Sequence, residues 1–421
     1  MQDIESEDKK RLFSNFFSLL ILQGANYVLP LITFPYLVQV LGIDYFGLLA
    51  FATAIIAYLS IITDYGFNLT ATREISIHRD NKEKVIEIFS AVMTIKFILM
   101  ILSFLLLFVI VFSFEKFSTH WDIYFFTFAT VVGQVLFPVW FFQGMESMKY
   151  ISYLNIFAKS IFTIAIFIFV EEQSDFYLVP LFTSAGFIVA GLWSLFLIHK
   201  KFDITFKWQS INTLKEYLID GWHIFISRIY VNLYTTTNII LLGVFTNNTA
   251  VGYYSIAEKI VVAIGGLFEP ANQTIFPYLA RKYKENFTQF VVFVKKIALL
   301  FFFISLSFVL FFEYFKETVV YLVTGSYNLE VSVLLGVFLL RVLSYPFGAL
   351  FSNSLIIMNR KKEFMRVMNY TVLLDLLIVP LSIYHYQAMG LVISFILVLF
   401  VHISLLLYYL NKSIQNERVN T

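Results

Sequence analysis

The chain has 421 residues, of which 59% are hydrophobic and 14% are charged, and its mean hydropathy is +0.79. Soluble domains carry about a quarter charged residues, so this composition excludes an ordinary soluble protein and indicates a membrane protein. Cysteine is absent, which excludes disulfides, thiolate metal ligands and a cysteine nucleophile. The formal net charge of +2 says little by itself, because the placement of charge matters more in a membrane protein.

Apolar blocks long enough to cross a bilayer, about 20 residues each, recur along the whole chain. The first block lacks a small-residue cleavage site and is too long for a signal-peptide core, so we expect a retained first helix. The loops between blocks are too short to fold as separate domains. Hydropathy predicts an all-α polytopic membrane protein with about twelve transmembrane helices, at 14–40, 45–67, 86–112, 121–143, 150–170, 176–198, 217–245, 250–276, 289–312, 331–357, 366–384 and 388–410.

Basic residues gather in alternate loops. One set of loops holds 21 of the 30 Lys and Arg residues, whereas the opposite set holds only Lys116 and Lys316. The positive-inside rule places the first set in the cytoplasm, so both termini are expected to be cytoplasmic. This topology accounts for the basic loops, and no nucleic-acid partner is expected.

The two halves of the chain show weak internal similarity. A shift of 205 residues aligns Gly47 with Gly252, and the acid Asp64 with the acid Glu269. Six spans in each half would make parallel repeats, as in several transporter folds. We therefore expect two pseudo-symmetric six-helix bundles around a central cavity, with an N-terminal bundle at 1–199, a cytoplasmic linker at 200–215 and a C-terminal bundle at 216–421.

Five basic residues stand well inside the predicted spans. Lys96 and Lys159 lie about 13 Å from a cytoplasmic end at 1.5 Å per residue, so packing and snorkelling of their long stems could account for them. Arg228, Lys259 and Arg341 lie near the middle of their spans. Because a charge in lipid costs several kcal/mol, each is expected to face either water or a structural partner on a neighbouring helix.

A polar stripe marks the first span. Gln23, Asn26 and Tyr27 share one helix face, and the 205-residue shift aligns Gln23 with Arg228 and Tyr27 with Asn232. Such a stripe either joins helices or lines an aqueous path. Its recurrence at equivalent positions favours the aqueous path.

Three acids inside or near the spans are candidates for ion coupling or gating. Asp375 stands in a Leu-Leu-Asp-Leu-Leu context without a local partner, so it is either a coupling group or one side of a helix–helix hydrogen bond. Asp64 and Glu269 lie near cytoplasmic ends of their spans, where gating salt bridges and simple interfacial placement both fit.

No enzyme constellation is found. The six histidines are scattered without metal-ligand spacing, and no Walker lysine motif occurs. We therefore expect no catalytic residues, metal or cofactor and no ATPase activity; if the chain is a transporter, it is a secondary one, driven by a gradient of H⁺ or Na⁺.

Three segments carry a family resemblance. They are LPLITFPYLVQVLGIDYFGLLAFATA from Leu29 followed by ITDYGFNLTATREIS, LFPVWFFQGMESMKYISYLNIFAKS from Leu136, and YTTTNIILLGVFTNNTAVGYYSIAEKI from Tyr234. Taken jointly, these segments resemble the Wzx-type polysaccharide flippases, whose superfamily also holds the MATE drug exporters and the lipid II flippases. Beyond about residue 280 the resemblance is one of topology.

The resemblance implies translocation of undecaprenyl-diphosphate-linked O-antigen or capsule units between leaflets of the bacterial inner membrane by alternating access. It places Arg73 and Glu74 at the cytoplasmic mouth, and Lys259 in a matched Ala-Glu-Lys-Ile stretch that faces the lumen. It also places Trp140, Gln143 and Gly144 at the end of the fourth span. Lipid II flippases carry two more spans, which weakens a lipid II assignment.

These observations give a predicted site and its alternatives. The headgroup site is expected to contain Arg228, Lys259 and Arg341 with Gln23, Asn26, Tyr27 and Asn232, and the gating or coupling candidates are Asp64, Arg73, Glu269 and Asp375. Polymerase and chain-length proteins of the same pathway are the expected protein partners. The alternatives are a drug or small-molecule cation antiporter of the same fold, a polysaccharide polymerase or ligase, for which the outer loops are short, and a structural scaffold.

Overall fold

The computed structural model describes the backbone of residues 2–420 and the side chains of residues 29–417, apart from Val231, Tyr234, Thr235 and Gln273. Within these residues every regular element is an α-helix or a short 3₁₀-helix. The predicted all-α class is confirmed. The polar stripe at Gln23, Asn26 and Tyr27 lies outside the described side chains.

Nine helical segments of the described chain are long and apolar enough to cross a membrane. Two of them, Leu29–His78 and Lys361–Glu417, are too long to cross once, and each contains a sharp backbone break, at Gly42 (φ 75°) or Gln387 (φ 50°). A multi-pass membrane protein is thereby confirmed. The predicted total of twelve spans stays a prediction, because α9 (Ile211–Thr235) and α10 (Thr237–Phe245) fall outside the nine segments.

The chain divides into two compact units between Thr236 and Thr237. The expected boundaries of 1–199, 200–215 and 216–421 concern membrane bundles and stay a prediction. Unit 1 holds α1 (Gln2–Asp64), α2 (Phe67–His78), α3 (Lys82–Ser113), α4 (Glu115–Ser118), α5 (Trp121–Leu136), α6 (Val139–Gly144), α7 (Met148–Phe169), η1 (Gln173–Tyr177), α8 (Leu178–Phe202) and α9. Unit 2 holds α10, α11 (Asn248–Gly266), α12 (Glu269–Glu285), α13 (Phe287–Tyr314), α14 (Lys316–Thr324), α15 (Leu329–Phe338), η2 (Leu339–Leu343), α16 (Ser344–Ile357) and α17 (Lys361–Asn420).

Side-chain caps determine where several of these helices begin. An oxygen of the capping residue accepts a hydrogen bond from the backbone N–H three residues further along, which satisfies one of the free donors of the first turn. The capping residues of α3, α9, α11, α13 and α15 are Asn81, Ser210, Asn247, Asn286 and Asn328.

Several spanning segments are interrupted rather than continuous. In unit 1, α1 and α2 are separated by Tyr65 and Gly66, both with positive φ (49° and 83°), and α5 and α6 are separated at Phe137 and Pro138. In unit 2 the 3₁₀-helix η2 separates α15 from α16. Interruptions of this kind are tolerated inside a membrane only where protein or water satisfies the freed backbone groups.

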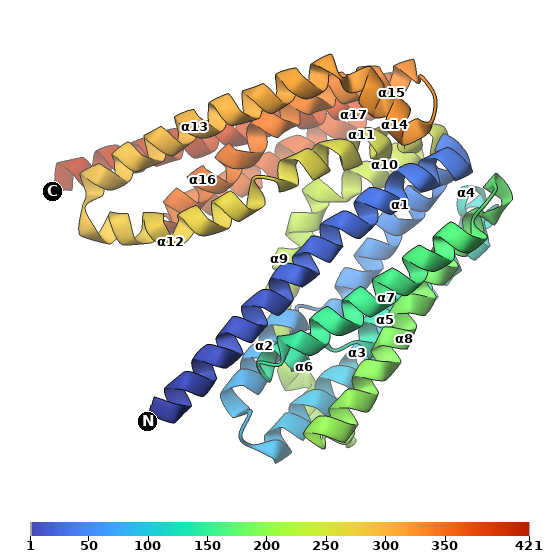
Figure 1. The fold of residues 1–421 in the computed structure, drawn as a ribbon, viewed down its shortest axis with the longest axis vertical. Helices are drawn as coiled ribbons and strands as arrows, with labels where there is room; N and C mark the ends of the chain where they lie inside the picture. Colours follow the sequence, from blue (N-terminus) through green and yellow to red (C-terminus); the bar gives the residue numbers. More distant parts are fainter. Residues whose placement is uncertain (1, 421) are drawn as a thin grey trace. The chain divides into compact units, whose positions relative to one another are not determined.

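Close backbone packing holds α5 against α8 in unit 1, where α7 runs beside α8 (Figure 1). Small residues make this approach possible: a Cβ on Gly133 would lie 2.6 Å from the Cβ of Phe187, and a Cβ on Gly191 would lie 2.7 Å from the Cβ of Leu136. Packing between membrane helices depends on such small residues, because lipid provides no hydrophobic drive for association.

Gly133→Ala is expected to lower the free energy of unfolding by about 1–3 kcal/mol, because the added methyl overpacks the α5–α8 contact. The measurement is unfolding of the purified protein in mixed micelles. Gly348→Ala is the matched control, since a Cβ at Gly348 in α16 meets nothing within 4 Å, and alanine favours a helix by up to about 1 kcal/mol. Equal losses in both variants would contradict the packing explanation.

Candidate functional site

Unit 1 contains a polar cavity of about 340 Å³, which we call the unit 1 cavity. It lies where two helix interruptions meet the rest of the unit, since it is lined by residues on both sides of the α1–α2 break and of the α5–α6 break. Its polar lining comes from the six helices α1, α2, α3, α5, α7 and α9 and comprises Ser60, Thr63, Asp64, Asn68, Lys96, Gln134, Asn155, Arg228 and Asn232.

A buried ion pair forms one wall of the unit 1 cavity. The Nζ atom of Lys96 lies 3.6 Å from Oδ1 of Asp64, and the two side chains are 6% and 24% exposed. Asp64 is the last residue of α1, so the break that follows turns its carboxylate toward α3. Lys96 thus packs inside unit 1 and is paired with Asp64.

Arg228 is the second cation of the cavity and belongs to α9. Its side chain is exposed, and within the described side chains it makes neither an ion pair nor a hydrogen bond. Lys96 is balanced by Asp64, so the cavity carries one excess positive charge. An unbalanced guanidinium in a polar cavity is a ready binding group for phosphate or carboxylate.

Asn232 lies one turn beyond Arg228 and serves mainly its own helix. Its Nδ2 donates to the Arg228 carbonyl at 3.0 Å, and its Oδ1 accepts from the Thr236 hydroxyl at 3.1 Å. Its carbonyl accepts a hydrogen bond of 3.0 Å from the Tyr58 hydroxyl of α1. Asn232 thus ties the last turns of α9 to α1, and this anchors the turn that carries Arg228.

Sequence reasoning missed the uncharged amides of this cavity. Asn68, Gln134 and Asn155 come from α2, α5 and α7 and line the same space as Arg228. Gln134 and Asn155 are lone amides in apolar stretches, which was the available signal, whereas Asn68 stands among polar residues. Whether such an amide faces the cavity or a neighbouring helix depends on how each helix is rotated about its axis, which a single sequence does not give.

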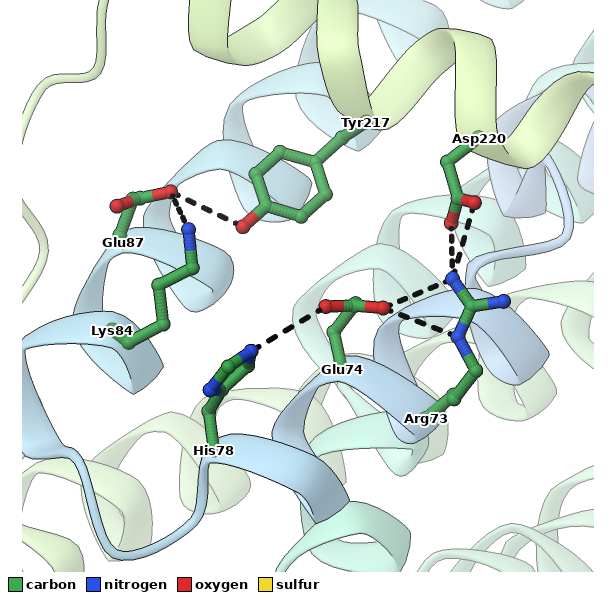
Figure 2. A network of polar contacts seen from close by, with 7 residues as sticks. All are labelled: Arg73, Glu74, His78, Lys84, Glu87, Tyr217 and Asp220. Atoms are coloured by element: carbon green, nitrogen blue, oxygen red, sulfur yellow. Dashed lines mark hydrogen bonds and ion pairs between the residues drawn. The ribbon is translucent and has the colours of Figure 1, made fainter.

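A network of exposed polar contacts fixes the first turns of α9 to α2 and α3 (Figure 2). Arg73 of α2 pairs with Asp220 of α9 at 3.0 Å and with the neighbouring Glu74 at 2.9 Å. The Tyr217 hydroxyl of α9 donates to Glu87 of α3 at 3.2 Å. These charges are partly exposed, so each pair contributes at most about 1 kcal/mol and can open and close readily.

Three residues of the family-like Trp-Phe-Phe-Gln-Gly segment hold α6 against α2. The Thr72 hydroxyl lies 3.3 Å from Oε1 of Gln143 and 3.2 Å from the Trp140 carbonyl. A Cβ on Gly144 would lie 2.7 Å from Ile75. This segment therefore positions the helix that carries Arg73.

Unit 2 has its own buried charge pair. Nη1 of Arg341 lies 3.5 Å from Oε1 of Glu258, and the two side chains are 17% and 19% exposed. The guanidinium also lies over the rings of Phe395, Tyr345 and Phe338, at 4.9, 5.2 and 5.5 Å from their centroids. The sequence left two alternatives for Arg341, water or a structural partner, and the structure shows the partner. Arg341 lies in η2, and this position brings its side chain to Glu258.

The other predicted residues of unit 2 occupy different settings. Lys259 is exposed on α11 beside Glu258, and Glu269 is exposed in the first turn of α12, where a carboxylate complements the helix dipole. Asp375 of α17 is only 2% exposed; its Oδ1 has no hydrogen-bond partner among the described atoms, and the Asn238 side chain of α10 faces it. No group of three or more His, Asp and Glu side chains suited to a metal occurs in the described part of the chain.

The family of polysaccharide biosynthesis proteins matches residues 12–283 of this chain. The chain belongs to this family. The resemblance to the Wzx-type polysaccharide flippases, and with it membership of the multidrug, oligosaccharidyl-lipid and polysaccharide exporter superfamily, is confirmed.

Two relatives resemble this chain in sequence, and one solved structure resembles it in fold. The chain is 34% identical over 289 residues to an Escherichia coli (strain K12) protein named "Putative O-antigen transporter", covering 69% of this chain and 70% of that one. A Shigella dysenteriae protein of the same name is 29% identical over 400 residues, covering 94% and 98%. The fold is similar to that of a multidrug resistance MATE family transporter of the MOP superfamily in an inward-facing conformation, with a TM-score of 0.74, 16% identity, and coverage of 93% and 96%.

Asp64→Asn is expected to destabilise the protein by about 3–5 kcal/mol, because it leaves the Lys96 ammonium buried without a counter-charge. Combining it with Lys96→Met should restore most of the loss, since an apolar chain of similar length needs no partner. The measurement is the unfolding free energy in mixed micelles. As a control, Glu285→Gln, which removes an exposed carboxylate of α12, should cost less than about 1 kcal/mol.

Proposed function

We propose that this protein flips an anionic lipid-linked oligosaccharide, an undecaprenyl-diphosphate-linked O-antigen or capsule unit, from the cytoplasmic to the periplasmic leaflet of a bacterial inner membrane. The proposal is supported by family membership and by relatives that are named as O-antigen transporters. We further propose that both termini are cytoplasmic, because 21 of the 30 Lys and Arg residues belong to one set of alternate loops.

The proposed cargo needs a hydrated path. A diphosphate with several sugars cannot enter hydrocarbon, since an unpaired charge or hydroxyl loses its hydration there. A polar cavity within a membrane-spanning unit supplies replacement partners, while the polyprenyl tail remains in lipid. Alternating access, in which one half of a transporter rocks against the other, then moves the headgroup.

The observation that carries this proposal is the position of Arg228. It faces the unit 1 cavity and has no counter-charge among the described side chains, whereas Lys96 is paired with Asp64. The excess positive charge favours an anion over the cationic drugs of the alternative hypothesis. Asn68, Gln134 and Asn155 add amide groups that can hydrogen-bond sugar hydroxyls.

The contacts between α9 and α2 suit a gate. Arg73, which the resemblance places at the cytoplasmic mouth, binds Asp220, which lies about two turns before Arg228 on α9. Because this pair is exposed and weak, a small change in binding energy would be enough to open it. We assign Arg73 and Asp220 to opening and closing of the cavity.

Asp375 is the proposed coupling residue. It is buried in α17 with one carboxylate oxygen unpartnered, and the Asn238 side chain beside it offers a second oxygen ligand. A buried carboxylate with an open oxygen can take up H⁺ or Na⁺, and either ion would remove the cost of its charge. We propose that this event drives the return step of the cycle.

Arg228→Gln is expected to lower the flipping rate by about 10- to 100-fold, the value of one lost hydrogen bond to a charged group. The measurement is complementation of a flippase-null strain, followed as surface polysaccharide and as accumulation of lipid-linked units in the cytoplasmic leaflet. Arg228→Lys should keep part of the activity, and Lys412→Gln, an exposed basic residue outside the cavity, should keep all of it.

Normal surface polysaccharide in an Arg228→Gln strain with normal protein levels would refute the proposed site. A dye-export assay in the same cells tests the antiporter alternative. Export of cationic dyes without any rescue of polysaccharide would replace the flippase proposal by that alternative.

Asp375→Asn is expected to abolish the dependence of flipping on the H⁺ or Na⁺ gradient. An amide does not take up and release H⁺, and it offers no negative charge to Na⁺. Asp375→Glu, which keeps the carboxyl group, should retain the dependence. The measurement is flipping of a labelled lipid-linked sugar in proteoliposomes with each gradient imposed and then dissipated. Gradient dependence that survives in Asp375→Asn would place the coupling elsewhere.

A further inference from the structure

An apolar groove of about 670 Å³ lies on unit 1 outside the cavity described above. Its walls are α3 and the last turns of α8, and the segment 204–208 between α8 and α9 closes one end. The lining is almost wholly hydrophobic and includes Phe97, Ile98 and Leu195. A volume of this size falls within the range of pockets for single small ligands, roughly 300–1,000 Å³.

The segment that closes the groove is fixed in place. Asp203 makes an exposed ion pair with Lys82 at the start of α3, and the hydrogen bond and charge of Lys82 lower the pKa of the Asp203 carboxyl, but the firm contacts of the segment are those of its next residues. The Lys207 backbone N–H donates to Oγ of the buried Ser90 at 3.0 Å, and Ile204 is 5% exposed within the core of the unit. The groove is therefore a formed feature of the fold.

The depth of the groove matches one leaflet of a bilayer. Its lining on α3 runs from Phe89 to Ile101, which is about 18 Å at 1.5 Å per residue. The hydrocarbon core is about 30 Å thick, so one leaflet measures about 15 Å. A single acyl chain has this reach, whereas a long polyprenyl chain exceeds it.

The closed end of the groove is amphipathic and basic. The rings of Phe206 and Trp208 meet edge to face with centroids 5.3 Å apart, and Trp208 is 85% exposed, as is usual for aromatic residues at a membrane–water interface. Lys200 and Lys207 directly follow the lining residues His199 and Phe206, and neither forms an ion pair within the described side chains. The neighbouring carboxylate, Asp203, is taken by Lys82.

We propose that this groove binds one anionic phospholipid of the cytoplasmic leaflet, with an acyl chain between α3 and α8 and the phosphate held by Lys200 and Lys207. Basic pockets beside spanning helices attract anionic headgroups in this way. The bound lipid would hold the segment between α8 and α9 against the membrane and so support the helix that carries Arg228. This inference does not depend on what the protein transports.

The test is native mass spectrometry of the purified full-length protein with phosphatidylglycerol and with phosphatidylcholine of identical acyl chains. The double variant Lys200→Gln/Lys207→Gln should bind phosphatidylglycerol about 30-fold more weakly, since each lysine near an anionic headgroup contributes about fivefold. Its binding of phosphatidylcholine should not change. Lys149→Gln, an exposed lysine elsewhere on the same unit, is the matched control and should match the parent for both lipids.

A second variant tests the apolar part of the groove. Ile98→Trp fills the groove from α3 and should lower the binding of both lipids, while the unfolding temperature shows whether the variant is folded. Unchanged phosphatidylglycerol binding in the double lysine variant would overturn the proposal. Stoichiometric displacement of phosphatidylglycerol by undecaprenyl phosphate would also overturn it, because the groove would then hold the tail of the transported lipid.

Discussion

The cost of placing an ionised side chain inside a membrane-spanning segment governs the arrangement of both units. Such a charge is stable only beside an opposite charge or water. Lys96 meets this condition with Asp64 in unit 1, and Arg341 meets it with Glu258 and three aromatic rings in unit 2. Arg228 meets it by facing a polar cavity. Of these three cations, Arg228 is solvated rather than paired, and it is therefore available to a ligand.

Interrupted helices are the means by which these charges come together. Asp64 stands directly before the α1–α2 break, and Arg341 lies within η2, which separates α15 from α16. At such points the chain changes direction and side chains leave the stripe of a regular helix. The break between α11 and α12 lies close to the position that the 205-residue shift from α1–α2 predicts. Both halves of the chain therefore have a helix break near the corresponding position.

Buried and exposed pairs contribute differently to a cycle of conformations. The Lys96–Asp64 pair is buried, so breaking it leaves an uncompensated charge, and it acts as a permanent part of unit 1. The Arg73–Asp220 pair is exposed, and its opening costs little because water replaces the partner (Figure 2). Within unit 1, the exposed pair can therefore open while the buried pair stays closed.

The sequence alone determined the membrane class, the helical architecture and the family, because long apolar blocks and local motifs are properties of adjacent residues. It also singled out Asp64, Arg228, Arg341 and Asp375 as unusual, since a charge in an apolar block is visible without a structure. Only the tertiary structure decided that Arg341 is paired with Glu258, that Asp64 neutralises Lys96, and that Gln134 and Asn155 share the cavity of Arg228. Those outcomes depend on helix rotations, breaks and close glycine contacts between residues far apart in the chain, and a charge is balanced or left open only once those helices have packed.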